Sequence, residues 1–120
     1  MAGVVTGMRA SVDRRIQVLI VRRRLEDHAA TLVEQATGER PGRHRFVARR
    51  LMLLATGVPD DGWPTAYGLG RRAAIVYRET STVLHGNRAF GDVPEQLVQE
   101  WEQVVADVAD AVARPGTVAR

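Results

Sequence analysis

The chain contains no cysteine, no lysine and few aromatic residues, and it has no hydrophobic run of membrane-spanning length. Without cysteine there is no disulfide scaffold, no thiolate metal site and no cysteine nucleophile. Its uncharged stretches, such as residues 51–59, are far shorter than the roughly 20 residues of a transmembrane helix. Residues 1–10 lack the basic start and long apolar stretch of a signal peptide. We therefore expect a cytoplasmic protein with no part in a membrane.

The length and composition of what is present fit one globular domain. The chain has 120 residues, of which 45% are hydrophobic, which is close to the ordinary value for a protein with a single core. We expect one helical domain at residues 11–114, between a flexible N-terminal arm at 1–10 and a flexible C-terminal tail at 115–120. No internal repeat or low-complexity segment divides this domain.

Arginine supplies all 17 basic side chains, and these are unevenly distributed. Residues 1–60 carry 11 arginines against six acidic residues, whereas residues 61–120 carry six against eight. A guanidinium stays charged and binds phosphate oxygens in bidentate fashion, so clustered arginines can follow a polyanion. The predicted contacts with nucleic acid are Arg22, Arg23, Arg45, Arg49, Arg71 and Arg72. The alternative is that arginine reflects a GC-rich coding sequence and that the clusters are solvated helix faces.

Hydrophobic periodicity predicts an all-α fold with four helices. The predicted helices cover residues 11–38, 43–56, 65–85 and 93–113, joined by short connections as in a small, mostly antiparallel four-helix bundle. Residues 16–21 are rich in β-branched side chains and could form a strand by themselves. We favour a helix there, because no second strand is present to satisfy its backbone groups.

Capping residues and apolar stripes define the predicted helix ends and core. Gly38, Gly57 and Gly86 are placed to end the first three helices. Asp92 and Glu95 fit a capping box for the last helix, with Pro94 in its first turn. The apolar stripes consist of Leu25, Ala29, Leu32, Val33, Ala36, Val47, Leu51, Leu54, Ala55, Leu69, Ala73, Val76, Tyr77, Thr80, Leu84, Leu97, Trp101, Val104, Val105, Val108 and Val112.

Trp63 lies in segment 58–64, whose two prolines, two aspartates and one glycine are typical of turns. We expect Trp63 to plug the core together with Phe46, Phe90 and Trp101, because a chain with six aromatic residues depends on them for much of its apolar burial. If Trp63 is instead exposed, segment 58–64 becomes the leading candidate for an oligomer contact.

The sequence contains only weak matches to patterns that bind a cofactor or a metal. Residues 68–73 match a dinucleotide-binding glycine pattern, but a turn precedes them where the nucleotide-binding fold needs a strand. His28, His44 and His85 are scattered without metal-ligand spacing, although a site built in three dimensions from His85 and Glu79 is the alternative. We therefore expect neither a cofactor nor a metal.

Segment 74–87 carries the candidate chemistry. Arg78 and His85 are seven residues apart, so on a helix they project in nearly the same direction. Metal-free RNA cleavage needs a base for the 2′-hydroxyl and a fixed cation for the charge that builds on the phosphate, and histidine and arginine can supply these. Ser81 lies one turn from His85 and could hydrogen-bond to it. The alternatives are that His85 merely caps the helix and that Arg78 pairs with a carboxylate such as Glu102.

Residues 77–87, Tyr-Arg-Glu-Thr-Ser-Thr-Val-Leu-His-Gly-Asn, followed by the last predicted helix, resemble the motif region of HEPN (higher eukaryotes and prokaryotes nucleotide-binding) domains. That family pairs an arginine with a histidine, with four to six residues between them, and six intervene here. The resemblance implies a four-helix fold, a homodimer that brings two motifs into one cleft, and metal-independent endoribonuclease activity. It also implies that Arg78 steadies the scissile phosphate, that His85 acts as acid or base, and that Ser81 at most assists. Active members often carry Asn, Asp or His after the arginine, where this chain has Glu79.

Two functional hypotheses follow from these observations. The first is a small HEPN-like ribonuclease, a toxin or defence effector that acts on RNA as a homodimer; as a toxin it would have a cognate antitoxin as partner. The second is a non-catalytic helical interaction module, or a small subunit of a larger complex, that contacts nucleic acid or an acidic partner through its arginine-rich helices. An antitoxin or immunity protein is not distinguishable from the second hypothesis by sequence. Replacing His85 separates the two, because only the enzyme would lose an activity.

Overall fold

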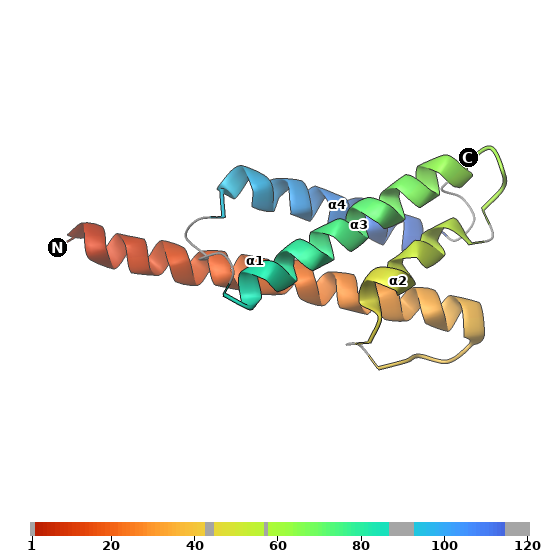
Figure 1. Cartoon of the computed structure of the whole chain (residues 1–120), viewed down its shortest axis with the longest axis horizontal. Helices are drawn as coiled ribbons and strands as arrows, with labels where there is room; N and C mark the ends of the chain where they lie inside the picture. The colour runs from red at the N-terminus through yellow and green to blue at the C-terminus, as the bar shows by residue number, and fades with distance from the viewer. Residues whose placement is uncertain (1, 43–44, 57, 87–92, 115–120) are drawn as a thin grey trace.

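The structure is a computed structural model that describes the backbone of residues 2–42, 45–56, 58–86 and 93–114, and the side chains of these residues from Val12 onward. Every regular element in this part of the chain is helical (Figure 1). The elements are α1 (Ala2–Thr37), α2 (Val47–Leu51), which continues directly into the 3₁₀ turn η1 (Met52–Ala55), α3 (Trp63–Leu84) and α4 (Glu95–Ala113). The predicted all-α bundle is therefore confirmed.

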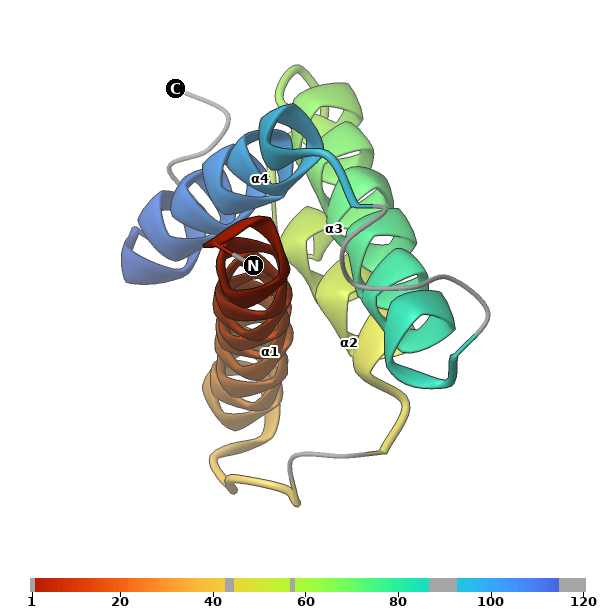
Figure 2. The same cartoon turned by 90° about the vertical axis from the view of Figure 1, so that its left-hand side faces the viewer.

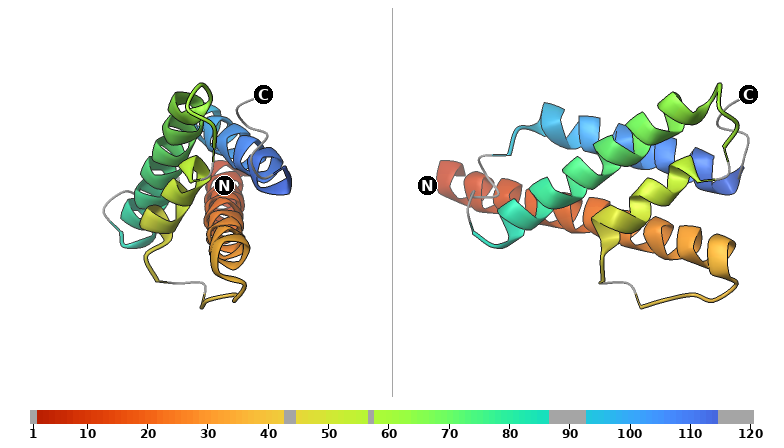
Figure 3. Two further views of the ribbon diagram at one scale, coloured as in Figure 1. Left: turned by 90° about the vertical axis from the view of Figure 1, so that its right-hand side faces the viewer. Right: turned by 45° about the vertical axis from the view of Figure 1, so that its right-hand side comes forward.

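The helices form a bundle in which α3 runs opposite to α1, α2 and α4 (Figure 1). Views along the bundle show α2 and η1 between α1 and α3, with α4 covering the other side of the α1–α3 pair (Figure 2, Figure 3). The core lies where these helices meet and includes Val18, Val21, Leu25, Leu51, Val76, Trp101, Val105 and Val108. Of the predicted stripe positions, only Ala36 is exposed.

α1 begins at Ala2, well before the predicted start near Ser11. Residues 2–10, predicted as a flexible arm before the first helix, are helical, so the predicted helix start near residue 11 is wrong. No proline lies between residues 2 and 37 to interrupt a helix, and a helix satisfies its own backbone hydrogen bonds without tertiary support. Residues 16–21 are helical, as predicted, and Gly38 ends α1 with a positive φ of 83°.

α2 starts later than predicted. It begins at Val47 rather than near residue 43, because Phe46 directly before it adopts a left-handed conformation with φ 54°. The last turn tightens into η1, after which Thr56 is extended. Gly57, the predicted end of this helix, lies outside the described residues.

α4 begins at Glu95 rather than at Val93. Pro94 is the N-cap residue, with an extended ψ of 145°, so Glu95 is the first helical residue and not the third. The predicted capping box is therefore wrong at Glu95, and Asp92 lies outside the described residues. A carboxylate in the first turn still interacts favourably with the helix dipole.

The burial of the aromatic residues differs from the prediction. Trp101 is 2% exposed and central to the core, whereas Trp63 is 46% exposed and Phe46 is 64% exposed. The prediction that Trp63 and Phe46 plug the core is wrong, and Phe90 lies outside the described residues. Trp63 instead begins α3 and stacks on Tyr67 one turn later, on the outside of the bundle.

Small residues on the inner face of α3 let this helix pack closely against the end of α2. A Cβ atom at Gly70 would lie 2.9 Å from the carbonyl oxygen of Leu51, so α3 approaches the end of α2 more closely than an alanine would allow. Ala66, Ala73 and Ala74 are also buried on this helix.

Candidate functional site

Arg78 and His85 both reach solvent. Arg78 lies on the exposed face of α3, and His85 is the C-cap residue of the same helix, followed by Gly86 at φ 81°. The backbone N–H of His85 donates to the carbonyl of Ser81 (2.9 Å), so His85 closes the helix through its backbone. Within the described residues, neither the guanidinium of Arg78 nor the imidazole of His85 has a hydrogen bond or an ion pair. Both groups are therefore available to a ligand.

The alternative ion pair between Arg78 and Glu102 is not formed. Glu102 lies across the bundle, where it lines a hollow between α1 and α4 together with Gln17 and Arg24. Glu79, the residue that departs from the HEPN pattern, lines a groove of about 230 Å³ between α3 and α4, beside Arg72. One residue turns a helix by about 100°, so the Glu79 carboxylate projects to the side of the line from Arg78 to His85.

The hydroxyl of Ser81 forms its hydrogen bonds with residues other than His85. It accepts a hydrogen bond from Nη1 of Arg22 and donates to the carbonyl of Tyr77 (3.3 Å). The predicted hydrogen bond between Ser81 and His85 is not formed among the described side chains. Ser81 instead belongs to the contact between α3 and α1.

Arg22 joins α1 to α3 through a polar cluster that the sequence analysis did not find. Its guanidinium lies 4.1 Å from the centre of the Tyr77 ring and donates to Oγ1 of Thr80 (3.3 Å). Its Nε is 3.9 Å from Oε2 of Glu26, and the Tyr77 hydroxyl donates to the same carboxylate oxygen (3.0 Å). Arg22 was predicted to contact nucleic acid; the structure gives it a packing role, with 22% of its side chain exposed.

Burial, together with the hydrogen bond to Glu26, raises the pKa of Tyr77 to about 12 from its ordinary value of 10.0. In the unfolded chain the phenol loses its proton near pH 10, whereas in the folded chain it keeps the proton until about pH 12. Between these values the unfolded state binds fewer protons, so the free energy of unfolding falls as pH rises.

We therefore expect stability to fall between about pH 10 and 12, and Tyr77→Phe to remove this fall. Lysine and cysteine do not contribute to the pH dependence in this range, because the chain has neither, and arginine stays charged there. Urea unfolding followed by circular dichroism at a series of pH values measures the effect. Tyr67→Phe is the matched control and should keep the slope; a Tyr77→Phe protein with the parental slope would contradict the assignment.

The other five arginines predicted to bind nucleic acid are exposed, but they lie on different elements. Arg23 is on α1, Arg45 lies in the segment before α2, Arg49 is on α2, and Arg71 and Arg72 are on α3. Arg49 lies 5.5 Å from the centre of the Phe46 ring. They do not belong to one element, so tertiary structure and not the sequence clusters decides which of them share a face.

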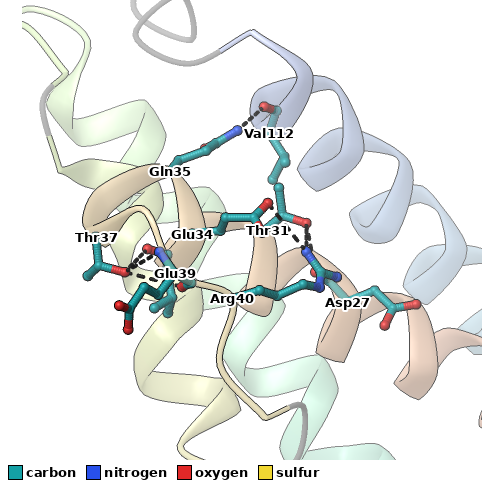
Figure 4. Close-up of polar contacts among 9 residues, drawn as sticks. Asp27, Thr31, Glu34, Gln35, Thr37, Glu39, Arg40 and Val112 are labelled. Carbon is teal, nitrogen blue, oxygen red and sulfur yellow. Dashed lines mark hydrogen bonds and ion pairs between the residues drawn. The ribbon is translucent and has the colours of Figure 1, made fainter.

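Some arginines of the first half make internal contacts instead. Arg40 donates to Oγ1 of Thr31 (3.1 Å) and lies 3.9 Å from the Glu34 carboxylate, which fastens the segment after α1 back onto that helix (Figure 4). Gln35 nearby donates to the carbonyl of Val112 (2.9 Å) and joins α1 to the end of α4 (Figure 4). These contacts stabilise the end of the bundle that lies away from His85.

The N-terminal part of α1 carries an apolar face that no other described residue covers. It consists of Val12, Ile16, Leu19 and Ile20, which are between 42% and 57% exposed and recur at helical spacing. α1 extends beyond the ends of α3 and α4 here (Figure 1). Ile16, Leu19 and Ile20 also line a hollow of about 540 Å³ with Leu84, the residue before His85. This α1 apolar face therefore borders the Arg78–His85 end of α3.

Histidines and carboxylates do not gather into a metal site in the described part of the chain. Desolvation lowers the pKa of His28, which keeps this half-buried imidazole neutral at a pH where a free histidine is charged. His44 lies outside the described residues. For the alternative site from His85 and Glu79, the residues that the structure describes supply no third ligand of this kind.

Comparison of the chain with protein-family models, with curated proteins and with solved structures finds no match. Among the described helices, none combines the length and the apolar character that crossing a bilayer requires.

Proposed function

We propose that this chain is a metal-independent endoribonuclease of the HEPN type, with Arg78 and His85 at the reacting phosphate, and that it acts as a cytoplasmic homodimer in a toxin or defence role. The observation that supports this best is the state of these two side chains. Both are exposed on one side of α3, and neither is engaged by another described residue. Both side chains are therefore free to contact a bound phosphate.

The distance between the two residues suits one phosphodiester. Seven residues correspond to roughly 10.5 Å along the helix axis, and a long arginine side chain can cover more than half of that. His85 takes the proton of the 2′-hydroxyl, the 2′-oxygen forms a bond to phosphorus, and the bond from phosphorus to the 5′-oxygen breaks. The products are a 2′,3′-cyclic phosphate and a 5′-hydroxyl, which takes its proton from a second acid. Arg78 offsets the charge on the phosphate oxygens throughout.

A second copy supplies that second acid in the proposed dimer. The α1 apolar face, formed by Val12, Ile16, Leu19 and Ile20, is the kind of contiguous apolar surface that forms interfaces. Because Leu84 lies at its edge, a twofold axis across this face would bring two His85 side chains toward one cleft. One imidazole then acts as base and the other as acid.

Replacement of His85 tests the proposal directly. We expect His85→Ala to reduce RNA cleavage in the presence of a chelator by about 10²- to 10⁴-fold, the usual contribution of general acid–base catalysis. Arg78→Ala is expected to reduce it by about 10²- to 10³-fold. The assay follows a single-stranded RNA by gel electrophoresis, and circular dichroism checks that each variant is folded.

Thr65→Ala is the matched control, because Thr65 is an exposed threonine near the start of the same helix, far from Arg78 and His85. It should cleave at the parental rate. If the parent protein cleaves no RNA, or if His85→Ala cleaves as fast as the parent, the ribonuclease proposal is wrong. The non-catalytic interaction module, which the exposed α1 apolar face also suits, would then be the better description.

A further inference from the structure

The outer face of α3 begins with a stacked aromatic pair. The Trp63 and Tyr67 rings have centroids 4.8 Å apart and are inclined by 18°, and both side chains reach solvent. A tryptophan that is 46% exposed in a folded chain leaves a large apolar surface in contact with water. The pair is held rigidly, since both residues lie in the first turns of a long helix.

Two free cations continue the same face. From Trp63, the residues at successive turns are Tyr67, Arg71, Ile75 and Arg78, which repeat at intervals of three or four and so share one side of the helix. Arg71 and Arg78 are exposed, and in the described part of the chain neither guanidinium has a hydrogen bond or an ion pair. We call these five residues the aromatic-basic track. It leads from the start of α3 toward His85.

We propose that the aromatic-basic track binds single-stranded RNA, with an unpaired base stacked on Trp63 and phosphates bound by Arg71 and Arg78. This inference rests on the proposed function, because it states how the substrate is held away from the reacting phosphate. A base can stack on a protein ring only when its face is not covered by neighbouring base pairs, so the track selects single strands. Trp63 and His85 are roughly 33 Å apart along the helix, which leaves room for several nucleotides.

The distribution of charge determines in which direction an RNA strand runs along the aromatic-basic track. Asp60 and Asp61 lie three and two residues before Trp63 and are exposed, so they repel a phosphate backbone at that end. Beyond Trp63 the only carboxylate on the exposed side of α3 is Glu79, which projects toward the groove between α3 and α4. A strand anchored at Trp63 is therefore drawn along Arg71 and Arg78 toward His85.

Tryptophan fluorescence of a His85→Ala protein tests the inference without interference from cleavage. Of the two tryptophans only Trp63 is exposed, since Trp101 is 2% exposed. A single-stranded RNA about a dozen nucleotides long is expected to quench the emission of Trp63 on binding. In the same background, with binding measured by the anisotropy of a fluorescently labelled RNA, Trp63→Ala should weaken binding about 5- to 100-fold, whereas Trp63→Phe, which keeps a ring, should retain most of it.

Phe46→Ala is the matched control, because Phe46 is an exposed aromatic residue of another segment; it should bind RNA as the parent does. Arg71→Gln should reduce the slope of log affinity against log salt by about 0.7. The inference is overturned if Trp63→Ala binds as tightly as the parent, if a duplex of the same length binds equally well, or if Trp63 responds only to a partner protein. If RNA binds through Trp63 but the parent protein cleaves no RNA, the ribonuclease proposal is wrong and the inference about the aromatic-basic track stands. If the parent protein cleaves RNA but RNA binding does not depend on Trp63, only the inference about the track is wrong.

Discussion

Replacing Trp101 with alanine is expected to lower the free energy of unfolding by about 3–5 kcal/mol. Trp101 is buried in α4 at the centre of the core, and its truncation leaves a cavity that the helices around it can fill only in part. A domain of this size has a total stability of about 5–15 kcal/mol, so the variant should be close to unfolding at 37 °C. Urea unfolding at 25 °C, followed by circular dichroism at 222 nm, measures the loss.

Trp63→Ala is the control for this experiment, because it removes the same side chain from the surface. We expect it to cost less than about 1 kcal/mol, since Trp63 is 46% exposed and stacks on Tyr67 at the surface of the bundle. The two midpoints in urea should therefore differ widely. Equal losses in the two variants would contradict the burial of Trp101 and the exposure of Trp63.

Replacing Arg22 with methionine is expected to cost about 2–3 kcal/mol at neutral pH. The substitution removes a cation from beside the Glu26 carboxylate, which is 5% exposed, and it also removes the hydrogen bonds to Thr80 and Ser81. The expected cost is below the 3–5 kcal/mol typical of a fully buried pair, because Arg22 keeps some contact with water.

A second substitution separates the charge effect from lost packing. Adding Glu26→Gln to the Arg22→Met protein should recover part of the stability, because it removes the buried negative charge while keeping an acceptor for the Tyr77 hydroxyl. Arg23→Met, at the exposed neighbouring position, should change stability by less than about 0.5 kcal/mol. If the double variant is less stable than Arg22→Met, electrostatics is not the main contribution of Arg22.

Only part of the candidate site could be predicted from the sequence. Arg78 and His85 lie on one helix, so their spacing along the chain already placed them on one side of it, and the structure leaves both exposed. Ser81 is on the same helix, but its hydroxyl is bound to Arg22, which is 59 residues away in sequence. No local pattern predicts a contact of that separation, because it depends on how α1 lies against α3.

The sequence by itself determined the helical class, the approximate extent of α3 and α4, and most of the core. These features follow from apolar residues at helical spacing and from hydrogen bonds between residues four apart, both of which are local. The tertiary structure alone decided that Trp63 and Phe46 face solvent, that Arg22 packs inside a polar cluster, and that the α1 apolar face stays uncovered. The physical reason is that burial depends on which neighbouring helix covers a given face and how closely it approaches. At Gly70, for example, α3 approaches the end of α2 too closely for even a methyl group.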